Sequence, residues 1–163
     1  MGNLSESSFT CSDCGESVLE QVFFCSHCGS IFSNTVCCSI HSTSPADGGC
    51  VICSKPFCKE CGGKVNHIYL CTTHEVYETY EGMARVAGCT DNVQAQFLTK
   101  CLEQAGFHPF LYSRYFNPGA DIVAIEKIYR VYGEHPIVEL KILVPFQEVL
   151  GAEVVLDEIL ETQ

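Results

Sequence analysis

The chain has 163 residues and a formal net charge of −11, with 20 acidic side chains against 9 basic ones. This length fits one ordinary domain or two small ones. Proteins bind a phosphate backbone through clustered Lys and Arg, and both halves of this chain are acidic, so nucleic acid is not an expected partner. The N-terminal residues lack the basic start and apolar run of a signal peptide, and no window reaches the roughly 18 apolar residues of a membrane span. A cytoplasmic protein with no membrane partner is therefore expected.

Cysteine sets the first half of the chain apart, because eleven of the 13 cysteines lie before residue 75. Cysteines and histidines there form six pairs whose members lie three positions apart: Cys11/Cys14, Cys25/Cys28, Cys38/His41, Cys50/Cys53, Cys58/Cys61 and Cys71/His74. In a reducing cytosol, such spacing indicates metal binding or redox chemistry more often than disulfides. Six pairs supply twelve ligands, which predicts three tetrahedral Zn²⁺ ions per chain.

Two other uses of these cysteines fit the sequence less well than structural zinc does. A redox C-x2-C motif of the thioredoxin kind opens a long helix after a buried strand, whereas "CKECGGKVNH" is broken by two glycines. A catalytic zinc keeps one coordination position open, whereas here protein residues can fill all twelve positions. The sequence therefore favours structural sites, whose metal provides the folding energy of segments too short to bury a core.

The first two pairs, "CSDCG" and "CSHCG", predict two metal-binding knuckles joined by a short hairpin over residues 16–24. A glycine follows the second cysteine of both pairs, as Gly62 follows Cys61, and glycine can adopt the positive φ that turns the backbone N–H inward. This pattern is similar to a zinc ribbon, expected here over residues 1–32. Its four ligands would be Cys11, Cys14, Cys25 and Cys28, with His27 solvated.

Two arrangements are open for the remaining eight ligands. Sequential pairing joins Cys38/His41 to Cys50/Cys53, whereas interleaved pairing joins the first pair to the third and the second pair to the fourth. The gap "SKPF" between the second and third pairs is short for a boundary between independent sites, which favours interleaving.

The run "CCSIHSTSPADGGCVICSKPFCKECGGKVNHIYLCTTHE" resembles a B-box zinc finger, a cross-brace that binds two zinc ions, expected over residues 33–78. The resemblance implies one site made of Cys38, His41, Cys58 and Cys61, and a second made of Cys50, Cys53, Cys71 and His74. Many B-boxes carry Asp and closing histidines at the middle positions, where this chain has Cys53 and Cys71. Cys37 is adjacent to Cys38, but the spacing to His41 favours Cys38 as the ligand.

Residues 79–163 have an ordinary composition and predict an α+β sandwich of ferredoxin-like type. Strands are expected at 83–88, 107–113 and 136–144. One helix is expected from the cap Asp91 to Gly106, and a second after Pro145. The first helix should bury Val93, Phe97, Leu98, Cys101, Leu102 and Ala105, and the second Val149, Ala152, Leu156, Ile159 and Leu160.

The segments "NVQAQFLTKCLEQAGFHPFLYS" and "KILVPFQEVLGAEVVLDE" are similar to a small bacterial family described as signal-transducing proteins with a PII-like ferredoxin fold. The family carries no defined catalytic residues. Between the second and third strands, the long insert 114–136 predicts an extra strand pair or a contact loop using Arg114, Tyr115, Phe116 and Arg130.

The leading hypothesis is a non-enzymatic adaptor or signal-transducing interaction protein with three structural zinc sites and a protein partner. One alternative is a ubiquitin-ligase accessory or ligase acting through the B-box-like part, although residues 30–36 lack the ligands that a RING domain needs. Another is a PII-like sensor of a small molecule in the C-terminal domain. A homo-oligomer that covers the sheet face is kept open as well.

Overall fold

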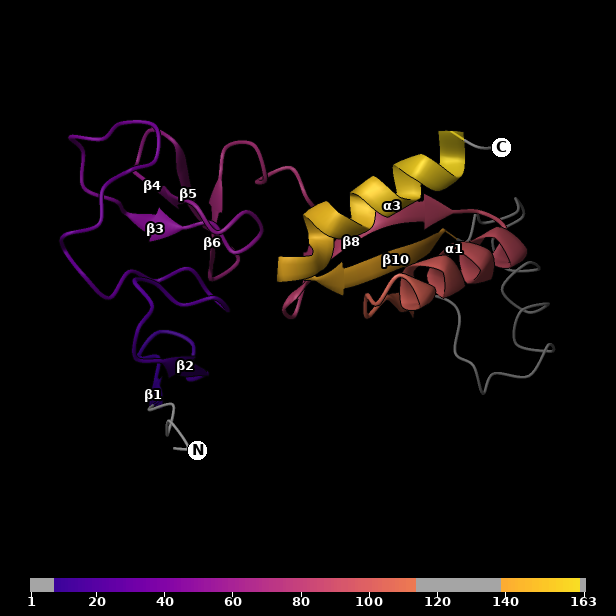
Figure 1. Ribbon diagram of the computed structural model, residues 1–163, viewed down its shortest axis with the longest axis horizontal. Coiled ribbons are helices and arrows are strands. Elements are labelled where there is room, and N and C mark those ends of the chain that lie inside the picture. The colour runs from indigo at the N-terminus through magenta and orange to yellow at the C-terminus, as the bar shows by residue number, and fades with distance from the viewer. Residues whose placement is uncertain (1–7, 114–138, 162–163) are drawn as a thin grey trace, which may run out of the picture. The chain divides into compact units, whose positions relative to one another are not determined.

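Figure 1 shows the computed structural model, which describes residues 8–113 and 139–161. The chain divides into two compact units, Met1–Glu78 and Thr79–Gln163. The first is a Cys-rich unit, and the second is a mixed α/β unit. Neither helix in the described residues is both long and apolar enough to cross a bilayer. The expected insert 114–136, including Arg114, Tyr115, Phe116 and Arg130, lies outside the described residues.

In the first unit, each of the first two knuckles closes a small hairpin of its own. Strand β1 (Ser8–Thr10) pairs antiparallel with β2 (Ser17–Leu19) around the first knuckle, and a bridge between Phe24 and Ile31 encloses the second. The expected hairpin over residues 16–24 is therefore wrong, because β2 pairs backward with β1 across the first knuckle. We call residues 8–32 the ribbon.

Residues 33–78, called here the cross-brace, contain two short hairpins. Strand β3 (Gly48–Gly49) pairs with β4 (Pro56–Phe57), and β5 (Gly62–Val65) pairs with β6 (Ile68–Cys71). The β5–β6 turn places Asn66 and His67 at positive φ, as a tight two-residue hairpin turn requires. The buried apolar side chains are Val51, Ile52, Phe57 and Leu70, whereas Ile68 and Tyr69 are half-buried.

The ribbon packs directly against the cross-brace through backbone contacts. The Tyr69 N–H donates to the Cys28 carbonyl at 2.7 Å, and the Gly49 N–H donates to the Gly29 carbonyl at 2.8 Å. A Cβ added at Gly29 would lie 2.2 Å from the Gly49 oxygen, and one added at Gly49 would lie 2.3 Å from the Phe24 ring. The two parts approach closely because both of these positions lack a side chain.

The second unit has a four-stranded antiparallel sheet in the order β7-β8-β10-β9. Its elements in chain order are β7 (Thr79–Tyr80), β8 (Met83–Cys89), α1 (Asn92–Gln104), β9 (Phe110–Tyr112), β10 (Leu140–Pro145), the 3-10 turn η1 (Phe146–Glu148) and α3 (Val149–Glu161). Both β8 and β9 run antiparallel to β10 between them, so they run in the same direction. The helices α1 and α3 contact each other and both central strands, so they cover one face of the sheet (Figure 1).

Helix α1 begins at the predicted cap but buries a different face from the expected one. The Asp91 carboxylate accepts a hydrogen bond from the Val93 N–H at 3.0 Å. The buried residues of the helix are Ala95, Leu98 and Leu102, whereas Val93 is 75% exposed and Phe97 is 47% exposed. Burial was therefore predicted correctly for Leu98 and Leu102 and wrongly for Val93, Phe97 and Ala105.

Helix α3 and strand β10 supply the other side of this core. Val149, Ala152 and Leu156 are buried as expected, while Leu160 is 51% exposed. The strand β10 is interrupted by a register shift against β8 between Ile142 and Leu143. The Tyr80 and Tyr112 rings lie 5.3 Å apart, and Lys141, between the buried Leu140 and Ile142, donates to the Tyr80 hydroxyl at 2.9 Å.

The contact between ribbon and cross-brace can be tested with two alanine substitutions. Gly15 and Gly29 follow equivalent cysteines and have φ of 79° and 87°, but a Cβ at Gly15 meets nothing within 4 Å. We expect Gly15→Ala to lower the free energy of unfolding by about 1–2 kcal/mol, which is the cost of placing alanine in a left-handed backbone conformation. Gly29→Ala should cost roughly 1–3 kcal/mol more, because it also overpacks the contact.

The measurement is denaturant unfolding of each zinc-loaded variant at a fixed concentration of free zinc. Gly63→Ala is a further control, because a Cβ there meets nothing within 4 Å and its φ is not positive. If Gly15→Ala and Gly29→Ala lowered the free energy of unfolding by the same amount, this would contradict the close packing of Gly29 against Gly49.

Candidate metal centres

The described residues bring the predicted ligands together in three clusters, each with four donor atoms within 4.8 Å of one another. The clusters are Cys11, Cys14, Cys25 and Cys28 (site 1); Cys38, His41, Cys58 and Cys61 (site 2); and Cys50, Cys53, Cys71 and His74 (site 3). Sites 2 and 3 follow the interleaved pairing. The two sets of ligands alternate along the chain, so one segment wraps both centres.

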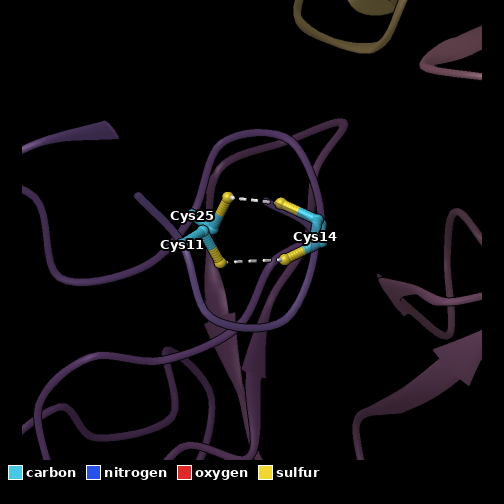
Figure 2. A group of neighbouring side chains, drawn as sticks. Cys11, Cys14 and Cys25 are labelled. Carbon is cyan, nitrogen blue, oxygen red and sulfur yellow. Dashed lines mark hydrogen bonds between the residues drawn. The ribbon is translucent and has the colours of Figure 1, made fainter. Parts of the chain in front are cut away.

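Site 1 has the dimensions of a tetrahedral centre with four cysteine ligands (Figure 2). The Cys11 and Cys28 sulfurs lie 3.8 Å apart, and the Cys14 and Cys25 sulfurs lie 3.6 Å apart. With Zn–S bonds of about 2.3 Å, a regular tetrahedron has S···S edges of about 3.8 Å. A disulfide would instead require a separation of about 2.05 Å. None of the 13 cysteines, all within the described residues, is in a disulfide.

Sites 2 and 3 each add one imidazole, which points its Nδ1 atom at the sulfurs. The His41 Nδ1 lies 3.3 Å from the Cys58 sulfur and 3.4 Å from the Cys61 sulfur. The His74 Nδ1 lies 3.1 Å from the Cys71 sulfur and 3.5 Å from the Cys50 sulfur. Because Zn–N bonds are shorter than Zn–S bonds, the N···S edge of such a tetrahedron is about 3.6 Å. The donor sets and distances are consistent with three zinc ions.

Three C-x2-C pairs share one backbone conformation, which explains how the sequence positions their sulfurs. In each, the residue after the second cysteine has positive φ and donates its N–H to the carbonyl of the first cysteine at 2.8–2.9 Å. These residues are Gly15, Gly29 and Ser54. Ser54 has φ of 57° without being glycine, so the sequence did not identify the third knuckle by this criterion.

Gly62, in contrast, does not have the positive φ expected from its place after Cys61. It lies in β5, where an added Cβ would be 2.4 Å from the Leu70 carbonyl oxygen and 2.7 Å from the Phe57 ring. Glycine is needed here for close approach to β6 rather than for a turn.

The sulfurs in each cluster have very different proton affinities before a metal binds. Burial, with neighbouring thiols adding to it, raises the pKa of Cys14, Cys53 and Cys61 to about 12. Burial also acts on Cys38, but the backbone N–H groups of His41 and Ile40 outweigh it and hold the pKa of Cys38 at about 6. A full set of thiolates therefore needs a cation among them, and a divalent metal supplies that charge.

The other cysteines and histidines that the structure describes lie outside the clusters. Cys37 is exposed, and its neighbour Cys38 is the buried member of site 2. His27 and His67 are exposed as well. In the second unit, burial raises the pKa of Cys89, while Cys101 is half-buried on α1.

No family model matches this chain, and neither the curated proteins nor the solved structures searched contain a match. Zinc is supported here by the donor types, their spacing in the chain and their distances in space.

Loss of one ligand should remove one ion without disturbing the count elsewhere. Native mass spectrometry of protein purified without chelator should show three zinc ions per chain. We expect Cys58→Ser to lower the count to two, because site 2 would lose a ligand, and the exposed Cys37→Ser to keep all three. Loss of a zinc from Cys37→Ser would make Cys37, rather than Cys38, the ligand.

Metal removal should unfold one unit only. Both α-helices of the described residues lie in the second unit, so the circular dichroism signal at about 222 nm should survive chelation. The amide NMR signals of residues 8–78 should collapse toward random-coil positions and recover when zinc is added back. Dispersed signals from residues 8–78 in protein shown by mass to be metal-free would contradict this dependence.

Proposed function

We propose that this chain is a non-enzymatic zinc-binding adaptor, a signal-transducing interaction protein whose zinc-built unit presents a protein-binding surface. The observation that carries the proposal is that each of the three clusters already has four protein donors. A zinc ion held by four protein donors has no position for substrate or water, which is typical of structural rather than catalytic sites. The partner is a protein, and the free thiols fit a cytoplasmic location.

The two units are proposed to be a zinc ribbon joined to a B-box-like cross-brace, followed by a ferredoxin-like signalling domain. Interleaving of sites 2 and 3 supports the cross-brace. The sheet order supports the second assignment, because β8, α1 and β9 form a split β-α-β unit with β10 between its strands. The edge position beside β8 is occupied by β7, which precedes β8 in the chain. A homo-oligomer formed through the sheet face without helices belongs to this proposal.

A second candidate is an accessory role in ubiquitin transfer. It is favoured by the interleaved arrangement of sites 2 and 3, which fits a B-box, and the resemblance to a B-box implies a partnership with ubiquitin-ligase RING domains. Under this alternative the partner is a ubiquitin-conjugating enzyme or a ligase subunit.

The test is affinity capture with the zinc-loaded full chain, compared with the same chain stripped of metal. We expect at least one protein partner that binds the loaded chain directly after purification and is lost, by about tenfold or more in affinity, on stripping. Ubiquitin-conjugating enzymes among the captured proteins would favour the second candidate. Zinc-dependent turnover of a substrate, or binding that is unchanged by metal removal, would overturn the adaptor proposal.

A further inference from the structure

The ribbon uses one of its faces to contact the cross-brace. The Phe24 ring lies against Gly49, and the carbonyls of Cys28 and Gly29 accept hydrogen bonds from the cross-brace. Phe24 forms a bridge with Ile31, and the chain bends at Phe23 immediately before it. Phe24 is half-buried, whereas Phe23 is 64% exposed. Phe23 is therefore the ring of this pair that is available to a partner.

Two other apolar side chains are exposed next to Phe23 in the chain. Leu19, at the end of β2, is 48% exposed, and Val22 is 38% exposed. The ribbon already has its own core, in which Val18 packs with the three buried cysteines of site 1, Phe9 and Phe32. We call Leu19, Val22 and Phe23 the ribbon tip. In Figure 1, the β1–β2 hairpin that leads to this tip extends away from β3 to β6 within the first unit.

The charge around the ribbon tip restricts what could bind there. Residues 1–54 contain no Lys or Arg, and Glu16 and Glu20 of the ribbon are acidic, while Asp13 lies 3.5 Å from Lys64 of β5. A zinc ion held by four thiolates adds a net charge of about −2. Nucleic acid and anionic lipid would be repelled by this field, and so would the same tip of a second copy. A cationic occupant would be attracted.

We propose that the ribbon tip binds a segment of a partner protein in which apolar side chains are flanked by Lys or Arg. This inference rests on the proposed adaptor function and names the surface and the partner chemistry. An exposed aromatic ring is a common binding anchor, because it buries a large area at a low entropic cost. The acidic ribbon sets the orientation and the rate of association of the basic segment.

The test uses zinc-loaded, ¹⁵N-labelled full chain and short synthetic peptides made of leucine and lysine. Two comparison peptides separate the contributions: in one serine replaces leucine, and in the other glutamate replaces lysine. Fluorescence anisotropy measures the affinity, and amide shifts measure the location. We expect the leucine–lysine peptide to bind best, to weaken as salt is raised, and to shift the amides of residues 19–24 most.

Two matched variants assign the binding to the tip. Phe23→Ser should weaken binding by about tenfold or more, as expected for loss of an anchor. Val76→Ser, on the cross-brace, removes a side chain that is 81% exposed and should change the affinity by less than about twofold. Retention of three zinc ions by both variants in native mass spectrometry shows that they are folded. Leu19→Ser replaces Phe23→Ser if the latter loses metal.

The results distinguish failure of this inference from failure of the adaptor proposal. Amide shifts centred outside residues 19–24, or binding by Phe23→Ser as tight as that of the unchanged protein, would overturn the ribbon tip as the binding surface. The protein would then remain a zinc-dependent adaptor that uses another surface. Equal binding of the serine–lysine peptide would reduce the interaction to non-specific charge and overturn it as well. Binding at the tip, with no zinc-dependent partner in affinity capture, would retain the site and remove the adaptor function.

Discussion

The bonds between zinc and its protein donors are what the first unit depends on. Within residues 8–78 the buried apolar side chains other than cysteine are Val18, Val51, Ile52, Phe57 and Leu70. Full burial of such a side chain contributes about 1.5–3 kcal/mol, whereas ordering each residue of backbone costs about 1–2 kcal/mol. Burial of these side chains cannot by itself offset the entropic cost of folding a segment of this length. The twelve clustered ligands explain why the chain can fold with so small an apolar core.

The metal sites also determine where glycine is needed. The knuckle residues Gly15 and Gly29 have positive φ, so that the backbone can turn its N–H toward the preceding cysteine. Gly29 serves a second purpose, because its missing side chain leaves room for the Gly49 carbonyl. One residue thus shapes site 1 and also joins it to the strand that leads into site 3. Asp13, which accepts a hydrogen bond from Ser30 and lies 3.5 Å from Lys64, ties the other knuckle of the ribbon to β5.

The sequence predicts the clusters better than it predicts the packing around them. Spacing of three positions is a local property, so the six pairs are visible without a structure. Which pairs share an ion depends on the path of the whole chain, and spacing alone therefore leaves two arrangements open. The contact of the ribbon with the cross-brace could not be anticipated, because Gly29 and Gly49 carry no signal of what approaches them.

In the mixed α/β unit too, local features were predictable from the sequence, whereas packing was not. Asp91 marks the start of α1 through a local hydrogen bond, and this cap was predictable. The helical period of α1 is compatible with more than one buried face, because Val93, Phe97, Leu98 and Leu102 are all apolar. The position of the sheet determines that the face with Ala95 is buried. The two-residue strand β7 is too short to carry an alternating pattern, so the edge of the sheet beside β8 was missed.

The docking of the ribbon onto the cross-brace has a consequence for how the protein responds to its surroundings. Each bound ion stabilises the folded form in proportion to the logarithm of the free zinc activity. Where the sites belong to one packed unit, these contributions add, so a tenfold fall in zinc activity would remove about 1.4 kcal/mol per site, or about 4 kcal/mol in all. The first unit should therefore lose its fold over a narrow range of zinc activity, while the α/β unit, which has no part in the clusters, should keep its own.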